Sequence, residues 1–163
     1  MVPKKKSYIS PILSFDFHLE NYHKLLKKLK VENDLKQLGS LLKRSIDPSI
    51  QEVLETTDYE ALVVTDSNRE IVWADNGFKE MTGYAKDFAI GKRPTFLHGT
   101  NTSEATRDEI RQLIKEEKRF KAAITNYRKN GEEYQCQIDV LPLYDSENRL
   151  THFLAMEREK KVA

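Results

Sequence analysis

The spacing of apolar residues along the chain changes near Asp58. Before this residue, apolar side chains recur every three or four positions, a spacing that is typical of amphipathic helices. After it, short apolar runs alternate with Asn, Gly and Asp turns, which is typical of strands. The pattern predicts a helical region over residues 19–57 and a strand-rich domain over residues 58–159, with an arm at 1–18 and a tail at 160–163.

The helical region contains two successive apolar series, separated by a drift of register around residues 32–34. An isolated amphipathic helix is only marginally stable in water, so the second series must pack against something. We expect one long or two consecutive helices, and a homodimer that uses the second series; packing within one subunit is the alternative. We call this second series the apolar stripe: Val31, Leu35, Leu38, Leu42 and Ile46.

A further short helix is expected after the stripe, because Asp47 can cap exposed N–H groups and Pro48 suits the first helical position. The remaining elements alternate as strands, helices and strands, with Asn130-Gly131 as a signal for a two-residue hairpin loop. This order predicts an α+β fold, in which short helices cover one face of an antiparallel sheet. The expected strands are 61–65, 70–74, 120–128, 133–144 and 150–159, and the expected helices are 78–83 and 102–118.

The 27 Lys and Arg residues nearly balance the 26 Asp and Glu residues, which leaves a formal charge of +1. This balance lacks the basic footprint of nucleic-acid binders, so we expect no nucleic-acid partner.

No apolar run approaches the ~20 residues of a membrane span and no secretory signal is evident, so we expect a cytoplasmic protein. The single cysteine and the absence of zinc-like Cys/His spacing argue against a disulfide and a metal site. No catalytic or phosphate-loop motif is evident, so we expect no enzymatic activity.

Four segments of the strand-rich domain carry a recognisable pattern. Residues 70–84 end in Met-Thr-Gly-Tyr, and residues 91–99 read Gly-Lys-Arg-Pro-Thr-Phe-Leu-His-Gly. Residues 126–131 read Asn-Tyr-Arg-Lys-Asn-Gly, while Leu-Pro-Leu-Tyr-Asp from residue 141 is followed by Thr-His-Phe-Leu from residue 151. These segments resemble the PAS family, especially its light-oxygen-voltage (LOV) branch. The resemblance implies a five-stranded antiparallel sheet with short helices on one face and a pocket between them.

The chain matches only some of the positions that contact the flavin in LOV domains. A LOV photoreceptor forms a bond between a cysteine and its flavin, and the matching position here is Pro94. Three polar side chains of the family pair with the polar edge of the flavin, and only Asn126 matches one of them. Cys136 and Glu157 stand at the other two positions, and Glu157 brings a carboxylate where an amide is expected.

Further departures lie on the phosphate side of the implied flavin site. Thr95 and His98 stand where an arginine and a glutamine of the family would help to bind the phosphate tail. His98 and His152 raise the alternative of a haem ligand, but the alternation of the strand predicts that His152 points outward. We therefore expect no cofactor, with flavin or haem as the alternative, and both histidines at the surface.

Two residues of the implied pocket have open roles. Cys136 is interpreted as a small buried hydrophobe, with a contact to a ligand as the alternative. Glu157 alternates with Phe153 and Ala155, so period-two geometry places the three on the inner face. A buried carboxylate needs a partner, for which Asn126 or Arg128 is available; otherwise the strand frays and Glu157 reaches solvent.

The sequence thus predicts a stand-alone PAS sensory and signalling module. We expect it to dimerise and to act through a separate protein partner, with or without a small ligand. One alternative is a LOV-derived photosensor or redox sensor that binds flavin or haem without cysteinyl adduct chemistry. The other is a structural adaptor with a collapsed pocket. The expected pocket residues are Phe78, Phe96, Leu97, Ile124, Asn126, Cys136, Ile138, Phe153, Ala155 and Glu157.

Overall fold

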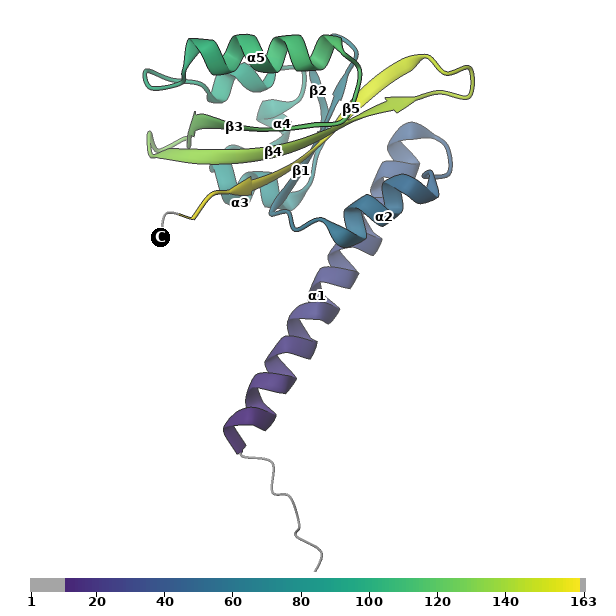
Figure 1. Ribbon diagram of the computed structural model, residues 1–163, viewed down its shortest axis with the longest axis vertical. Coiled ribbons are helices and arrows are strands. Elements are labelled where there is room, and N and C mark those ends of the chain that lie inside the picture. The colour runs from purple at the N-terminus through teal and green to yellow at the C-terminus, as the bar shows by residue number, and fades with distance from the viewer. Residues whose placement is uncertain (1–10, 162–163) are drawn as a thin grey trace, which may run out of the picture. The chain divides into compact units, whose positions relative to one another are not determined.

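A computed structural model describes residues 11–161, and the side chains from residue 14 onward (Figure 1). The chain divides into two compact units between Thr57 and Asp58. This division falls where the apolar pattern of the sequence changes, so the helical region and the strand-rich domain are separate units.

The first unit consists of helices α1 (Pro11–Leu42) and α2 (Pro48–Thr56). Of the two arrangements that the sequence allowed, the structure has the single long helix. It begins at Pro11, within the stretch interpreted as an arm, because a proline is accepted in the first helical turn. Residues 1–10 of that arm lie outside the described residues. The start of α2 is as predicted, since the Asp47 carboxylate accepts a hydrogen bond from the Ser49 backbone N–H at 2.8 Å.

The second unit contains a five-stranded antiparallel sheet in the order β2-β1-β5-β4-β3, which confirms the expected α+β fold. β5 therefore lies in the centre of the sheet, paired with β1 on one side and β4 on the other. The strands are β1 (Ala61–Asp66), β2 (Ile71–Ala74), β3 (Phe120–Tyr127), β4 (Glu133–Tyr144) and β5 (Leu150–Glu159). The helical segments between β2 and β3 are α3 (Asn76–Thr82), α4 (Lys86–Ala89), the 3-10 helix η1 (Pro94–Leu97) and α5 (Glu104–Lys115).

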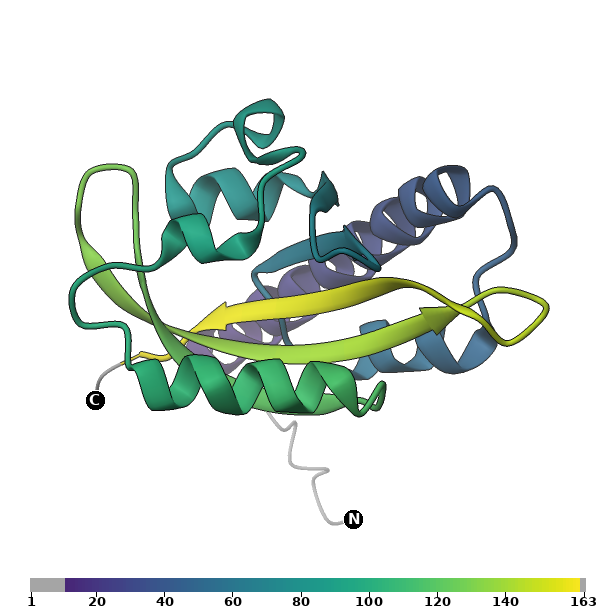
Figure 2. The same ribbon diagram turned by 90° about the horizontal axis from the view of Figure 1, so that it is seen from above.

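The helical segments pack against one face of this sheet. Phe78 of α3 and Leu97 of η1 are buried with Ala61 and Val63 of β1 in one apolar cluster. Ile110 of α5 joins this cluster and also a second one around Phe120, Val140 and Phe153. Figure 2 shows α5, which follows η1 in the chain, running alongside β3.

Three hairpin turns of the sheet share one geometry. In each turn, the residue before the loop donates its backbone N–H to the carbonyl four residues later, as Arg128 does to Glu132 at 2.9 Å. The carbonyl of the same residue accepts a hydrogen bond from the N–H three residues later, as that of Arg128 does from Gly131 at 2.9 Å. The third position adopts a positive φ in all three turns: 67° at Arg69, 87° at Gly131 and 59° at Asn148. The two-residue loop expected at Asn130-Gly131 is therefore wrong; the loop has three residues, with Gly131 in the left-handed conformation that closes such turns.

Candidate functional site

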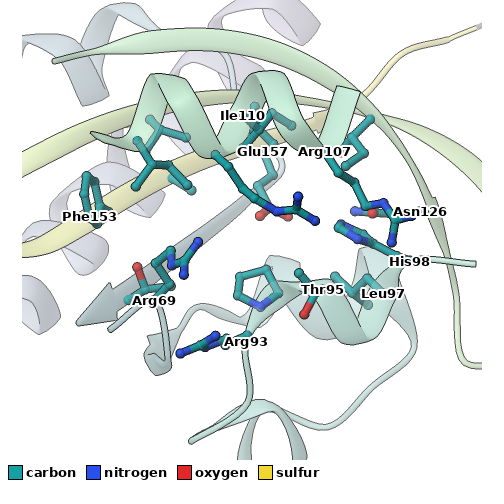
Figure 3. A pocket seen from close by; sticks show the side chains of 18 of the residues that line it. Arg69, Arg93, Thr95, Leu97, His98, Arg107, Ile110, Asn126, Phe153 and Glu157 are labelled. Carbon is teal, nitrogen blue, oxygen red and sulfur yellow. The ribbon is translucent and has the colours of Figure 1, made fainter. Parts of the chain in front are cut away.

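A cavity of about 360 Å³ lies between the sheet and the helical segments η1 and α5. Its size falls within the range of small-molecule sites, which is roughly 300–1,000 Å³. Figure 3 shows Arg69 and Arg93 on one side of the cavity, with His98 and Asn126 on the other. The lining residues are Thr65, Arg69, Arg93, Pro94, Thr95, Leu97, His98, Arg107, Ile110, Arg111, Ile114, Phe120, Ile124, Asn126, Ile138, Val140, Phe153, Ala155 and Glu157.

The floor of the cavity is the inner face of the sheet. Phe153, Ala155 and Glu157 alternate along β5, so their side chains point to the same face. Neighbouring strands add residues in register with them, since Val140 pairs with Ala155 and Ile138 pairs with Glu157. The alternation that marks β5 as a strand therefore also sets which of its side chains line the cavity.

The roof is one face of α5. Arg107, Ile110, Arg111 and Ile114 are spaced by three and four residues, which places them on one side of a helix. The start of α5 is fixed by Ser103, whose hydroxyl accepts a hydrogen bond from the Thr106 N–H at 3.3 Å. The roof thus contributes both apolar and cationic side chains.

The connection from η1 to α5 is anchored to β3. The Thr102 hydroxyl accepts a hydrogen bond from Gly99 N–H at 2.9 Å and donates one to the Thr125 carbonyl at 2.7 Å. Gly99 must lack a side chain, because a Cβ would come within 2.4 Å of the Tyr127 ring. The Tyr127 hydroxyl in turn accepts a hydrogen bond from Asn101 N–H at 3.0 Å. These contacts hold His98 at the cavity.

Four arginines line the cavity, and the sequence pattern did not identify them as site residues. Arg93 follows a segment that bonds to β2, since Ile71 N–H bonds to the Lys92 carbonyl at 2.8 Å. Arg69 is the left-handed residue of the β1–β2 turn. Arg107 and Arg111 come from α5, where Arg111 forms an ion pair with Asp108. The guanidinium groups come from three separate segments, which is why their convergence has no signal in the sequence.

Glu157 and Asn126 are buried polar residues of the cavity, only 6% and 5% exposed. Burial raises the pKa of the Glu157 carboxyl to about 7, and the nearby charge of Asp75 adds to the rise. The Oδ1 of Asn126 has no hydrogen-bond partner among the described residues. Of the two partners considered for Glu157, Arg128 forms an ion pair with Glu159 instead, at 2.8 Å. The fraying alternative is also wrong, because β5 extends to Glu159.

Cys136 lies on the inner face of β4 but not on the cavity. It is fully buried in the apolar cluster that contains Phe78, and its Sγ is 3.9 Å from a carboxylate oxygen of Glu157. Burial and the neighbouring Glu157 carboxylate raise the pKa of its thiol well above the ordinary range. A thiol with a raised pKa holds little thiolate at neutral pH, so Cys136 is a structural residue in this geometry.

Seven of the ten expected pocket residues line the cavity, while Phe78, Phe96 and Cys136 do not. Phe78 is 1% exposed inside the apolar core, and Phe96 packs edge-on against the stacked rings of Tyr84 and Phe88. His98 is half-buried on the cavity rather than at the surface, and its pKa is lowered by burial and by the charges of Arg107 and Arg111. The seven are Leu97, Ile124, Asn126, Ile138, Phe153, Ala155 and Glu157.

The apolar stripe, which extends past the end of α1 to Ile46, is largely buried. Val31 and Leu38 are buried, and Leu35, Leu42 and Ile46 are half-buried. The exposed large apolar side chains of α1 instead precede the stripe. We call them the exposed series: Phe15, Phe17, Leu19, Tyr22, Leu25, Leu26 and Leu29.

The described residues lack two other kinds of site. Within residues 11–161, no group of three or more His, Cys, Asp and Glu side chains is placed to hold a metal ion. In the same part of the chain, no helix combines the length and the apolar composition that a membrane crossing requires.

Comparison with known proteins identifies the family of the second unit. A PAS domain model matches residues 60–159. The chain belongs to the PAS domain family. The PAS domain is 32% identical over 101 residues to a blue-light photoreceptor of Listeria innocua serovar 6a, a match that spans 60% of this chain and 40% of that protein. It is 28% identical over 95 residues to the bacterioopsin transcriptional activator of Halobacterium salinarum, spanning 58% of this chain and 14% of that protein.

Another relative of the PAS domain is a membrane channel. The voltage-gated inwardly rectifying potassium channel KCNH3 of Homo sapiens is 33% identical over 91 residues, which are 55% of this chain and 8% of the channel. The chain thus spans less than half the length of these relatives. Family membership identifies a sensory domain, which has been joined to proteins of quite different activity.

Solved structures with the same fold include LOV domains. The dark structure of the blue-light photoreceptor Aureochrome1 LOV superposes with a TM-score of 0.65 at 26% identity, covering 72% of this chain and 87% of that one. The LOV domain from the Erythrobacter litoralis EL346 blue-light activated histidine kinase gives a TM-score of 0.58 at 22% identity, covering 63% and 96%. This second likeness concerns the fold alone.

Proposed function

We propose that this protein is a sensory PAS module that binds a small molecule non-covalently in the cavity beneath α5. The observation that carries the proposal is the cavity itself, which is open to a ligand of ordinary size and holds buried polar groups beside apolar walls. A few placed polar groups within an apolar pocket are the usual basis for ligand orientation. Asn126 and Glu157 are such groups.

A flavin fits the residues of this cavity poorly. The ring of a flavin presents acceptors and a donor along one edge, and buried polar groups of a ligand must find partners. Asn126 can supply such a partner, but the Cys136 sulfur lies off the cavity and Glu157 supplies a carboxyl group in place of an amide. Pro94 lines the cavity, and the resemblance to LOV domains assigns it to the position of their reactive cysteine, so adduct chemistry is not part of the proposal.

We further propose that the module dimerises through α1 and acts on a separate protein, without enzymatic activity of its own. The exposed series supports this proposal, because Phe15, Leu19, Tyr22, Leu26 and Leu29 follow each other by four and three residues in turn. This alternation is the spacing of the apolar positions in a coiled-coil seam, and a second copy of the same helix can complete such a seam. The proposed dimer interface therefore lies closer to the N-terminus of α1 than the apolar stripe, which the sequence had indicated.

An absorption spectrum of the purified protein, followed by mass spectrometry under native and denaturing conditions, tests the proposal. We expect no flavin or haem band in the visible range, before or after incubation with excess flavin mononucleotide and desalting. We also expect a bound small molecule, or uptake of one from an added mixture, in the native spectrum. A retained flavin band would contradict the proposal and identify a chromophore sensor.

A further inference from the structure

The charges around the cavity are unbalanced. Four arginines line it, whereas Glu157 is the only acidic residue among its lining residues. Burial keeps a large fraction of the Glu157 carboxyl protonated near neutral pH, since its pKa is raised to about 7. His98 does not add a charge there, because burial lowers its pKa. The cavity therefore carries a strong excess of positive charge.

Three of these arginines have no acidic partner among the described residues. Arg69, Arg93 and Arg107 form no ion pair in that part of the chain, and the buried Nε of Arg107 has no hydrogen-bond partner there. Arginines elsewhere in the unit are paired: Arg119 forms two hydrogen bonds to the Asp139 carboxylate, at 2.8 and 2.7 Å. Arginines that lack carboxylates and face a common cavity are arranged to receive an anion.

Arg69 also occupies an unfavourable backbone position. The third position of a three-residue hairpin turn requires a positive φ, which Gly and Asn tolerate and other residues adopt at a cost. The equivalent turns of this sheet have Gly131 and Asn148 there. A strained residue is a pointer to function when its side chain faces a site, as that of Arg69 does.

The rest of the lining describes the body of the ligand. Ile110 and Ile114 of the roof face Phe120, Val140 and Phe153 of the sheet, and these side chains leave apolar surface open to the cavity. Burying the apolar part of a ligand there is favourable, because it removes apolar surface from water on both sides of the contact. An inorganic anion alone would leave this surface unused.

We propose that the ligand of this cavity is an organic acid, with an apolar body and a carboxylate or phosphate group that Arg69, Arg93 and Arg107 hold. This inference rests on the proposed function and specifies the chemistry of its ligand. The apolar body lies between α5 and the sheet, and the acidic group lies among the guanidinium groups.

Two fluorescent probes with closely similar rings test the inference. 8-Anilinonaphthalene-1-sulfonate carries an acidic group, whereas N-phenyl-1-naphthylamine is its uncharged counterpart. We expect the full chain to bind the sulfonate about tenfold more tightly than the amine, as a charge-assisted contact of this kind permits. Octanoate and octyl phosphate should displace the sulfonate more strongly than octanol, and the better of the two acids identifies the acidic group.

Variants assign the preference to the arginines. Arg107→Gln and Arg69→Asn should each weaken the sulfonate about tenfold and leave the amine within about twofold. Arg69→Asn places a favourable residue in the turn, so a loss of binding in this variant is not a loss of folding. Arg149→Gln, which changes an arginine paired with Asp145, is the control and should alter neither probe.

The outcomes separate this inference from the proposed function. Equal affinity for the two probes, with no effect of Arg107→Gln or Arg69→Asn, would overturn the organic-acid inference and leave a ligand-binding cavity. Binding of neither probe would overturn the ligand-binding function itself.

Discussion

Glu157 is a buried carboxyl group whose side chain lies 3.9 Å from the Cys136 thiol, a long and weak hydrogen bond. Its environment contains the charge of Asp75 and the arginines of the cavity, and burial is the largest cause of its raised pKa. A carboxyl group that is easier to ionise in the unfolded chain than in the folded one makes stability depend on pH. The residue thus links the cavity to the stability of the unit.

The first prediction concerns Glu157→Gln. The folded pKa of about 7 lies above the ordinary value of 4.5, so the folded state binds more protons between these values. The free energy of unfolding of the wild type should therefore fall as the pH rises from about 4.5 to 7, by up to about 3 kcal/mol. Glu157→Gln should remove this fall and be the more stable protein at pH ~8.

Urea unfolding at a series of pH values measures this difference. The control is Glu147→Gln, which changes an exposed carboxylate in the β4–β5 turn. Curves of free energy against pH that run parallel for Glu157→Gln and the wild type would contradict the account of a buried, partly neutral carboxyl group.

Arg69 gives a second prediction at the residue scale, independent of any ligand. Arg69→Asn should raise the free energy of unfolding by about 0.5–1 kcal/mol, because asparagine tolerates the left-handed conformation better than arginine. The reverse change in the matching turn, Asn148→Arg, should lower it by a similar amount. Thermal or urea unfolding measures both, and a loss of stability in Arg69→Asn would show that Arg69 holds the turn together.

Single residues also show how much of the candidate site can be predicted from the sequence. Alternation along β5 predicted the inner face of Phe153, Ala155 and Glu157, because a strand has a fixed period. The same rule placed Cys136 on the inner face, but it does not say how far along the strand the cavity extends. Arg69 and Arg93 stand in loops, where no periodicity relates a side chain to a distant site.

At the scale of elements, strands and helices followed from local pattern, and exceptions arose at their ends. The five strands were predicted almost to the residue, since apolar alternation and turn residues mark both limits. Residues 1–18 were interpreted as an arm, although α1 begins at Pro11. The short segments α4 and η1 were not predicted, because four residues are too few to show a helical period.

The exposed series of α1 leads to a prediction at this scale. Leu26 lies in the middle of the proposed coiled-coil seam, so Leu26→Lys should place a charge between two copies of the helix. We expect the dimer dissociation constant to rise about tenfold or more, with the PAS unit still folded. Ile90→Lys changes an exposed apolar residue of the other unit and is the matched control.

Light scattering over a range of protein concentrations measures the assembly of both variants. A monomeric wild type, or a Leu26→Lys variant that dimerises as well as Ile90→Lys, would contradict an interface on this part of α1. If only substitutions in the apolar stripe dissociated the dimer, the interface would lie on the stripe, as the sequence first indicated.

At the scale of the whole molecule, the sequence identified the PAS fold and left the chemistry of the cavity open. The fold followed because strand order and turn signals are local, and because the PAS-like segments are spread along the length of the second unit. The cationic lining did not follow, since Arg69, Arg93 and Arg107 are brought together only by the pairing of β1 with β2 and the packing of α5. A PAS domain is a scaffold on which the site must be argued from its own residues.

The most direct test of the account is a titration of the isotopically labelled full chain with N-phenyl-1-naphthylamine, followed by nuclear magnetic resonance. Binding in the cavity predicts that the backbone signals of Ile110, Phe153 and Ala155, which come from its roof and floor, shift together and saturate at one probe per chain. Shifts confined to Leu25 and Leu26 of the exposed series, or no saturable shifts at all, would contradict a ligand-binding cavity.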